Sequence, residues 1–344
     1  MSTTWNGSAN SIAAASLLGV VWLFGNFSYS DLFAQEDPAA SIQAAQEFPD
    51  GITPNDVYKR IDLLDRVLDY LLAETKTVAP EAPRLIESRL GPLHVYQMVL
   101  ACAARMQEFD DLQGVLAVPT VSLKPKEYAP RDVRFAVDLM LESARRNAAK
   151  LKLAEPPDQE NEFSGKTPTD VFGKAMTVYV KLSALCGHDE ISSNDAYIQM
   201  ERAAEDVRSI LRQADEESRY RIDAPPSPKG LDTTDVFLKC MAIRRLLNEY
   251  RVAAGEAEVP LPKTGDGDQF APQDVFFQTQ IIISELNNLK LRTKTVSSTP
   301  LPVPVSRTKV PSDVHELTSL VEYLLQQVKT GKETQAIPRN SSSD

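Results

Sequence analysis

The chain has 344 residues, of which 42% are hydrophobic and 25% are charged, and this composition excludes a chain that is disordered throughout. Its 48 acidic and 37 basic residues leave a net charge of -11, which repels phosphate backbones and argues against a nucleic-acid partner. Three histidines and three cysteines supply little material for a transition-metal site or a disulfide framework.

An apolar run at residues 12–27 stands out near the amino terminus. It is short for a membrane span and typical of a secretory signal, so we expect residues 1–34 to be a signal peptide and residues 35–51 a linker. No Lys or Arg precedes Lys59, whereas signals normally open with positive charge. An uncleaved anchor at 12–27 and a buried helix are the alternatives. The expected location is periplasmic or secreted, or membrane-anchored by residues 12–27, and cleavage would leave no membrane insertion.

A short phrase recurs eight times and marks the start of a helix each time. Thr53 to Tyr58 reads TPNDVY, and related phrases begin at residues 91, 129, 167, 192, 232, 271 and 310. The first four phrases are 38 residues apart. A Thr, Ser or Asp at the N-cap, Pro at the first helical position and an acidic third position are all start signals of an α-helix. We interpret the recurring Asp as a cap rather than as a metal-binding or catalytic carboxylate.

Four of the phrases lack a capping oxygen, because Gly91, Ala129, Ala271 and Val310 stand at the N-cap. We expect the helices that follow them to fray more at their starts. In the second phrase, His94 replaces the acidic third residue.

Apolar residues continue at steps of three and four after each phrase, which predicts an amphipathic helix of about 22 residues in every copy. No proline falls inside a proposed helix body, and most stand at helix starts or in the connections. The connections, such as 78–90 and 296–309, are therefore predicted to be extended, and the 38-residue period leaves about 16 residues outside each helix. An extended segment of that length spans the whole helix, so it can return along the helix and start the next one at the same end. The sequence thus predicts an all-α, eight-helix repeat array.

The fourth and fifth phrases are only 25 residues apart, joined by residues 186–191. This short connection predicts an antiparallel helical hairpin. It divides the array into residues 52–187, with repeats one to four, and residues 188–330, with repeats five to eight. We favour two four-helix units over a continuous stack of repeats, and we expect residues 331–344 to be a disordered tail.

Cys186, His188, Asp189 and Glu190 form the densest cluster of groups that could ligate a metal. A structural site needs four ligands at workable spacing, and no second Cys/His pair lies nearby in the sequence. Gly187 follows an apolar helix and is typical of a helix end. We therefore interpret the cluster as an exposed turn.

The remaining reactive residues receive structural interpretations. Cys102 and Cys240 lie on apolar stripes and are expected to be small buried side chains, whereas His94 and His315 lie at helix starts with no thiol partner in the sequence. The arginine pairs Arg145–Arg146 and Arg244–Arg245 are expected on exposed, ion-paired faces. No catalytic, cofactor-binding or metal-binding residue and no cofactor is predicted.

These observations favour a non-enzymatic, exported helical-repeat scaffold or adaptor of a cell-envelope assembly, with a protein partner. The alternative is a helical-bundle sensor or binding module that holds a small ligand between its helices. An enzyme built from dispersed carboxylates and arginines is a third hypothesis. The Trp, Gly and Tyr positions of tetratricopeptide repeats are absent, and the sequence does not fix the oligomeric state.

Overall fold

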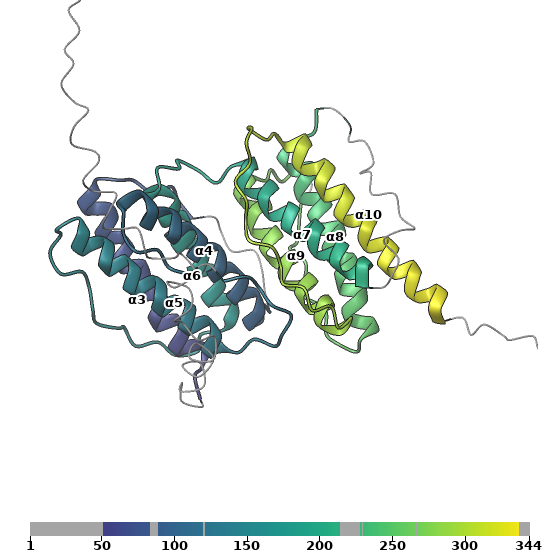
Figure 1. The fold of residues 1–344 in the computed structure, drawn as a ribbon, viewed down its shortest axis with the longest axis horizontal. Coiled ribbons are helices and arrows are strands. Elements are labelled where there is room, and N and C mark those ends of the chain that lie inside the picture. Colours follow the sequence, from purple (N-terminus) through teal and green to yellow (C-terminus); the bar gives the residue numbers. More distant parts are fainter. Residues whose placement is uncertain are drawn as a thin grey trace, which may run out of the picture. The chain divides into compact units, whose positions relative to one another are not determined.

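Residues 51–82, 89–119, 121–213, 228, 230–265 and 267–336 are described by the computed structural model, residues 329–336 by their backbone alone. Eight α-helices and no β-strand occur in this part of the chain (Figure 1), which confirms the predicted all-α, eight-helix fold. The helices are α3 (Pro54–Thr75), α4 (Pro92–Gln113), α5 (Pro130–Lys150), α6 (Pro168–Leu185), α7 (Ser193–Gln213), α8 (Thr233–Ala253), α9 (Pro272–Arg292) and α10 (Pro311–Ala336). They belong to one compact unit, Asp50–Asp344.

Predictions were made for both ends of the chain, and the structure describes part of the carboxyl-terminal one only. The predicted signal at residues 1–34 and the linker that follows it up to residue 50 lie outside the described residues. Helix α10 continues to Ala336, so the first residues of the segment 331–344, predicted as a disordered tail, are helical. Residues 337–344 lie outside the described residues.

Every helix begins where the repeated phrase predicts, and its third residue supplies the cap. In all eight copies the side chain of that residue accepts a hydrogen bond from the backbone N–H of the N-cap residue, at 2.7–3.0 Å. The N-cap side chain accepts from the helix only at Thr167 and Asp232. The four helices with Gly91, Ala129, Ala271 or Val310 at the N-cap rely on this bond from the third residue, and their greater fraying stays a prediction.

The four helices α3–α6, here called the first bundle, all start at the same end. Just before α6, Lys166 N donates to Asn55 Oδ1 in the first turn of α3 at 2.8 Å. Leu90 N, before α4, donates to Thr169 Oγ1 in the first turn of α6 at 3.0 Å. Before α5, the ring of Tyr128 stacks on that of Tyr96 in α4. These contacts make the four helices parallel.

The helices α7–α10, here called the second bundle, are also parallel, because their starts lie together at one end. The first-turn residues of all four helices surround one small cavity of about 10 Å³. Each helix lines it with the residue that follows the capping Asp in its phrase: Ala196, Val236, Val275 and Val314.

Two of the proline-rich linkers, residues 154–166 and 294–309, return along the bundles, as their length predicts. Residues 154–166 follow α3 backwards: Tyr70 donates to Ala154 O, Arg66 to Gln159 O, and Asn55 accepts from Lys166 N. Residues 294–309 follow α7 in the same way, with bonds from Gln213 to Lys294 O, from Arg202 to Pro300 O and from Lys309 N to Asn194. Each of these linkers therefore lies on the first helix of its bundle rather than on the helix it has just left.

Both bundles have the same order of helices around the core. In the first bundle, α3 and α4 each pack against α5 and α6, and in the second bundle α7 and α8 each pack against α9 and α10 (Figure 1). Helices α6 and α7 were predicted to pack together as an antiparallel hairpin, and this prediction is wrong: each packs within its own bundle. Their short connection passes from one bundle to the other.

The two bundles meet through α4 and α9. Gln97 Nε2 donates to Gln280 Oε1 at 2.9 Å, and His94 Nε2 lies 2.8 Å from Glu285 Oε1. The numbering rises along α4 while it falls along α9, so these two helices are antiparallel. The first bundle therefore runs in the opposite direction to the second.

One arginine pair departs from its predicted environment. Arg244 was expected on an exposed face, but it is buried and donates to Gln278 Oε1 at 2.6 Å and to Pro260 O at 2.8 Å. Its neighbour Arg245 is exposed as predicted. The uncharged acceptors provide the hydrogen bonds that a buried guanidinium requires.

A cleft between the two bundles

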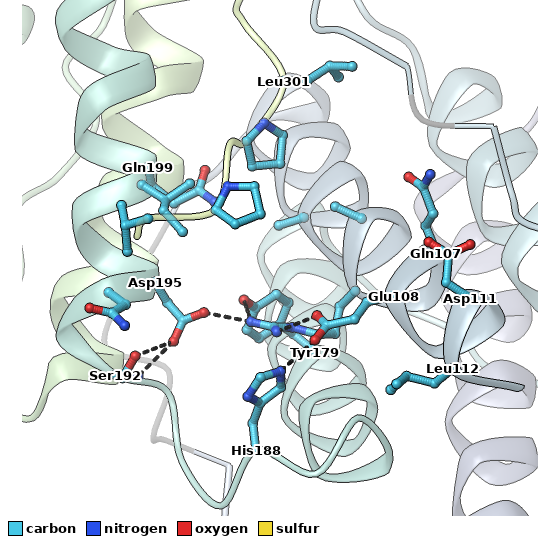
Figure 2. A pocket seen from close by; sticks show the side chains of 18 residues that line it. Gln107, Glu108, Asp111, Leu112, Tyr179, His188, Ser192, Asp195, Gln199 and Leu301 are labelled. Atoms are coloured by element: carbon cyan, nitrogen blue, oxygen red, sulfur yellow. Dashed lines mark hydrogen bonds and ion pairs between the residues drawn. The ribbon is translucent and has the colours of Figure 1, made fainter. Parts of the chain in front are cut away.

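A cleft of about 860 Å³ lies where the second half of α4 faces the start of α7. Its wall is completed by Tyr179 of α6, by the α6–α7 connection and by residues 301–305 of the linker before α10 (Figure 2). All these segments belong to the compact unit Asp50–Asp344. The cleft is thus built from three segments that are far apart in sequence.

The floor of the cleft, defined by Arg105, Glu108, Tyr179 and Asp195, is an ion-pair network. Arg105 leaves only 11% of its side chain exposed. Its guanidinium donates to Asp195 Oδ1 at 2.6 Å, to Glu108 Oε2 at 2.7 Å and to the Tyr179 hydroxyl at 2.8 Å. Burial lowers the pKa of Arg105, but Tyr179 and the two carboxylates outweigh burial and raise it. The cation is therefore permanent and fully paired.

Asp195 has two roles on this floor. Its Oδ2 caps α7 by accepting from Ser192 N and from Ser192 Oγ, both at 2.8 Å (Figure 2). Its Oδ1 accepts from Arg105. One carboxylate therefore joins α4 of the first bundle to the start of α7 in the second. The capping interpretation holds for this residue, but it is only half of its role.

Tyr179 makes a second connection between the bundles. Its ring stacks on Phe276 of α9 at a centroid distance of 4.5 Å and meets Phe277 edge to face. Burial is the main cause that raises the pKa of its hydroxyl, so the side chain is a neutral acceptor for Arg105. Through this hydrogen bond and this stacking, Tyr179 of α6 contacts both α4 and α9.

The rim of the cleft, defined by Asp111, Leu112 and Leu301, differs in kind from the floor. Leu112 of α4 is 60% exposed and Leu301 of the linker 43% exposed. Asp111 is exposed too. Counting all lining residues, three carboxylates stand against one guanidinium, so the cleft combines apolar walls with a net negative charge.

The cluster Cys186, His188, Asp189 and Glu190 does not act as a unit. His188 lines the cleft, and its Nε2 lies 2.7 Å from Glu108 Oε1. Cys186 Sγ points to Arg105 O at 3.5 Å, and burial raises the pKa of its thiol to about 12. Asp189 and Glu190 are exposed. Within the described residues no group of three or more His, Cys, Asp or Glu side chains could hold a metal ion.

The other reactive residues lie elsewhere. Cys102 and Cys240 are fully buried, as predicted, and burial raises the pKa of both thiols. His94 Nδ1 accepts from Gly91 N at 3.0 Å, so its Nε2 carries the proton and faces Glu285. Burial lowers the pKa of His315, whose Nδ1 lies 3.4 Å from Ser319 Oγ.

The sequence interpretation missed the residues that form the floor. An arginine on a helix is normally solvent-exposed, so Arg105 gave no signal by itself. A signal was present in its helix: α4 reads VYQMVLACAARM and α9 reads VFFQTQIIISEL, apolar on more than one face. Helices of this kind are buried on several sides, so the pattern marks α4 and α9 as central helices without showing that they pack against each other.

No known family model, characterised protein or solved structure matches this chain. In the described part of the chain, no helix is long and apolar enough to cross a membrane. The function has to be inferred from the cleft itself.

Proposed function

We propose that the chain is a non-enzymatic binding protein, an exported scaffold or adaptor of a cell-envelope assembly, and that a protein partner docks in the cleft. The contrast between floor and rim carries the proposal. The charged groups of the floor are paired within the chain, whereas the rim exposes Leu112 and Leu301 to solvent. Exposed apolar side chains around a concave site are typical of surfaces that bind another molecule.

Export is supported by the apolar run at residues 12–27. The cysteines are compatible with an oxidising compartment, because all three are free, Cys102 and Cys240 are fully buried, and the pKa of Cys186 is raised to about 12. A thiol reacts through its thiolate, which is scarce at these three positions. The odd number of cysteines therefore does not argue against secretion.

Quantitative affinity isolation from the envelope fraction of the native host tests the proposal. The full-length protein is compared with the double variant Leu112→Asp/Leu301→Asp and with a control, Leu238→Asp, which changes a leucine of α8 that is 47% exposed. We expect one protein to be recovered with the wild type and the control and to be lost with the double variant. Equal recovery with all three would refute docking in the cleft.

The size of the cleft favours a second candidate, a binding module for a small ligand. Its volume of about 860 Å³ lies in the range of small-molecule sites, roughly 300–1,000 Å³. Native mass spectrometry of protein purified from the host distinguishes the two. A bound molecule of small mass that is absent from Leu112→Asp/Leu301→Asp would support this candidate over a protein partner.

A further inference from the structure

Around the cleft, the positive charge has ion-pair partners, whereas some of the carboxylates have none. Arg105 is the one Lys or Arg among the described lining residues, and Asp195 and Glu108 already neutralise it. The carboxylate of Asp111 has no hydrogen-bond or ion-pair partner within the described residues, and this holds also for Asp189 and Glu190 in the connection beside His188. A partner therefore meets unpaired negative charge and no accessible positive charge, which favours a cation and repels an anion.

Of these three carboxylates Asp111 lines the cleft, and the surface beside it is apolar. Leu112 directly follows Asp111 on α4, and Leu301 faces the cleft from the linker (Figure 2). The small side chains of Ala101 and Ala104 leave space along α4. A cation alone would leave this surface uncovered, so the occupant has apolar side chains as well as a positive charge.

The linker side of the rim is held in place before any partner arrives. Pro300 O accepts from Arg202 Nε at 2.7 Å, and Thr299 N donates at 2.8 Å to Leu123 O in the linker between α4 and α5. Thr299 Oγ1 also donates to the buried Asp206 at 2.7 Å. Prolines at 300, 302 and 304 stiffen the segment further. A rigid rim lowers the entropy lost on binding.

We propose that the cleft binds a polypeptide segment in which apolar side chains stand next to a lysine or an arginine. The apolar side chains lie against Leu112 and Leu301, and the basic side chain pairs with Asp111. This inference rests on the proposed function and narrows it to one chemical class of partner.

Selection of peptides from a random displayed library on the full-length protein tests the inference. We expect the enriched peptides to combine aliphatic or aromatic residues with Lys or Arg. Binding of the best synthetic peptide should weaken about tenfold, equivalent to about 1.4 kcal/mol, in Asp111→Lys and in Leu112→Ser. Selection on Asp111→Lys should enrich acidic residues instead.

Two control variants carry matched changes outside the cleft. Glu74→Lys reverses an exposed acidic residue in the last turn of α3, as Asp111→Lys does in α4, and Leu238→Ser matches Leu112→Ser. Both controls should bind as the wild type does, and thermal melts confirm that all variants are folded. Peptides that depend on Leu112 but not on Asp111 would overturn the basic-segment inference and leave the proposed function intact. Failure to select any peptide that depends on Leu112 would overturn both.

Discussion

At the scale of single residues, the third residue of each helix is the constant element of the repeat. It accepts the N-cap amide in all eight copies, even where Ala or Gly stands at the N-cap. In the second copy, His94 Nδ1 accepts this bond in place of a carboxylate, and His94 Nε2 contacts Glu285. A cap thereby also contributes to the junction between the bundles.

The fourth copy allows the two capping groups to be compared. Asp170 accepts from Thr167 N and Thr167 Oγ1 at 2.7 Å, whereas Thr167 Oγ1 accepts from Asp170 N at 3.3 Å. We expect Asp170→Ala to lower the free energy of unfolding by about 1 kcal/mol and Thr167→Ala by less, because the backbone bond to Asp170 survives. Urea unfolding measures both. A larger loss for Thr167→Ala would contradict the role assigned to the third residue.

Glu285 gives the protein a specific acid sensitivity. Burial raises its pKa, but His94 and Arg251 outweigh burial and lower it to about 2 from the ordinary 4.5. The folded state therefore favours the carboxylate, and its contribution is complete above pH 4.5 and is lost as the pH falls towards 2. This pKa difference corresponds to about 3 kcal/mol.

Stability measured against pH checks this account of Glu285. The wild type should lose stability steeply between pH 4.5 and 2, and Glu285→Gln should flatten the curve in that window. Glu74→Gln, which changes an exposed residue, should keep the wild-type slope. An unchanged slope in Glu285→Gln would show that other carboxylates dominate acid unfolding.

At the scale of helices, the two bundles have different residue types at one pair of equivalent buried positions. Asp206 of α7 and Lys290 of α9 form a fully buried ion pair at 2.7 Å. Counted from the first residue of each helix, the corresponding positions in α3 and α5 hold Val67 and Ala148, which are also buried. The same fold thus accommodates either a charged or an apolar pair at this position.

Removing one member of this pair should be worse than removing both. Asp206→Val leaves the Lys290 ammonium buried without its partner, so we expect a loss of about 3–5 kcal/mol. Asp206→Val/Lys290→Met should recover most of that loss, because an apolar pair fills the position without the cost of burying charge. Denaturant unfolding of the three proteins tests this, and a double variant no more stable than the single one would contradict it.

The sequence predicted the individual elements better than their arrangement. Helix starts depend on neighbouring residues such as Pro168 and Asp170, and the return of the linkers follows from their length, so both could be predicted locally. The pairing of α4 with α9 depends on faces that many helices could offer. Arg105 was missed for this reason, and Arg244 was wrongly expected to be exposed, since only the tertiary structure buries these two side chains.

At the scale of the whole molecule, the described chain consists of two versions of one parallel four-helix unit. Besides the shared helix order, equivalent contacts recur: Lys166 lies over the ring of Tyr58, and Lys309 over that of Tyr197. Both lysines also donate their backbone N–H to an Asn in the first turn of the bundle's first helix. This repetition supports an internal duplication, and the cleft arises where the two copies meet.

Export is a prediction for the whole chain. Amino-terminal sequencing of protein from the native host should find a mature chain that begins near Gln35, because the run at residues 12–27 has the length of a signal. An intact Met1 or Ser2 in the soluble cytoplasmic fraction would contradict export and the envelope setting with it.

Site-specific photo-crosslinking in the native host tests the central claim, that the cleft binds a protein partner, most directly. A photoreactive amino acid is placed at Leu112, Leu301 or Leu238, which come from α4, the linker before α10 and α8 respectively. We predict one adduct of the same mass from Leu112 and Leu301 and none from Leu238. No adduct from the two cleft positions, or the same adduct from all three, would contradict the claim.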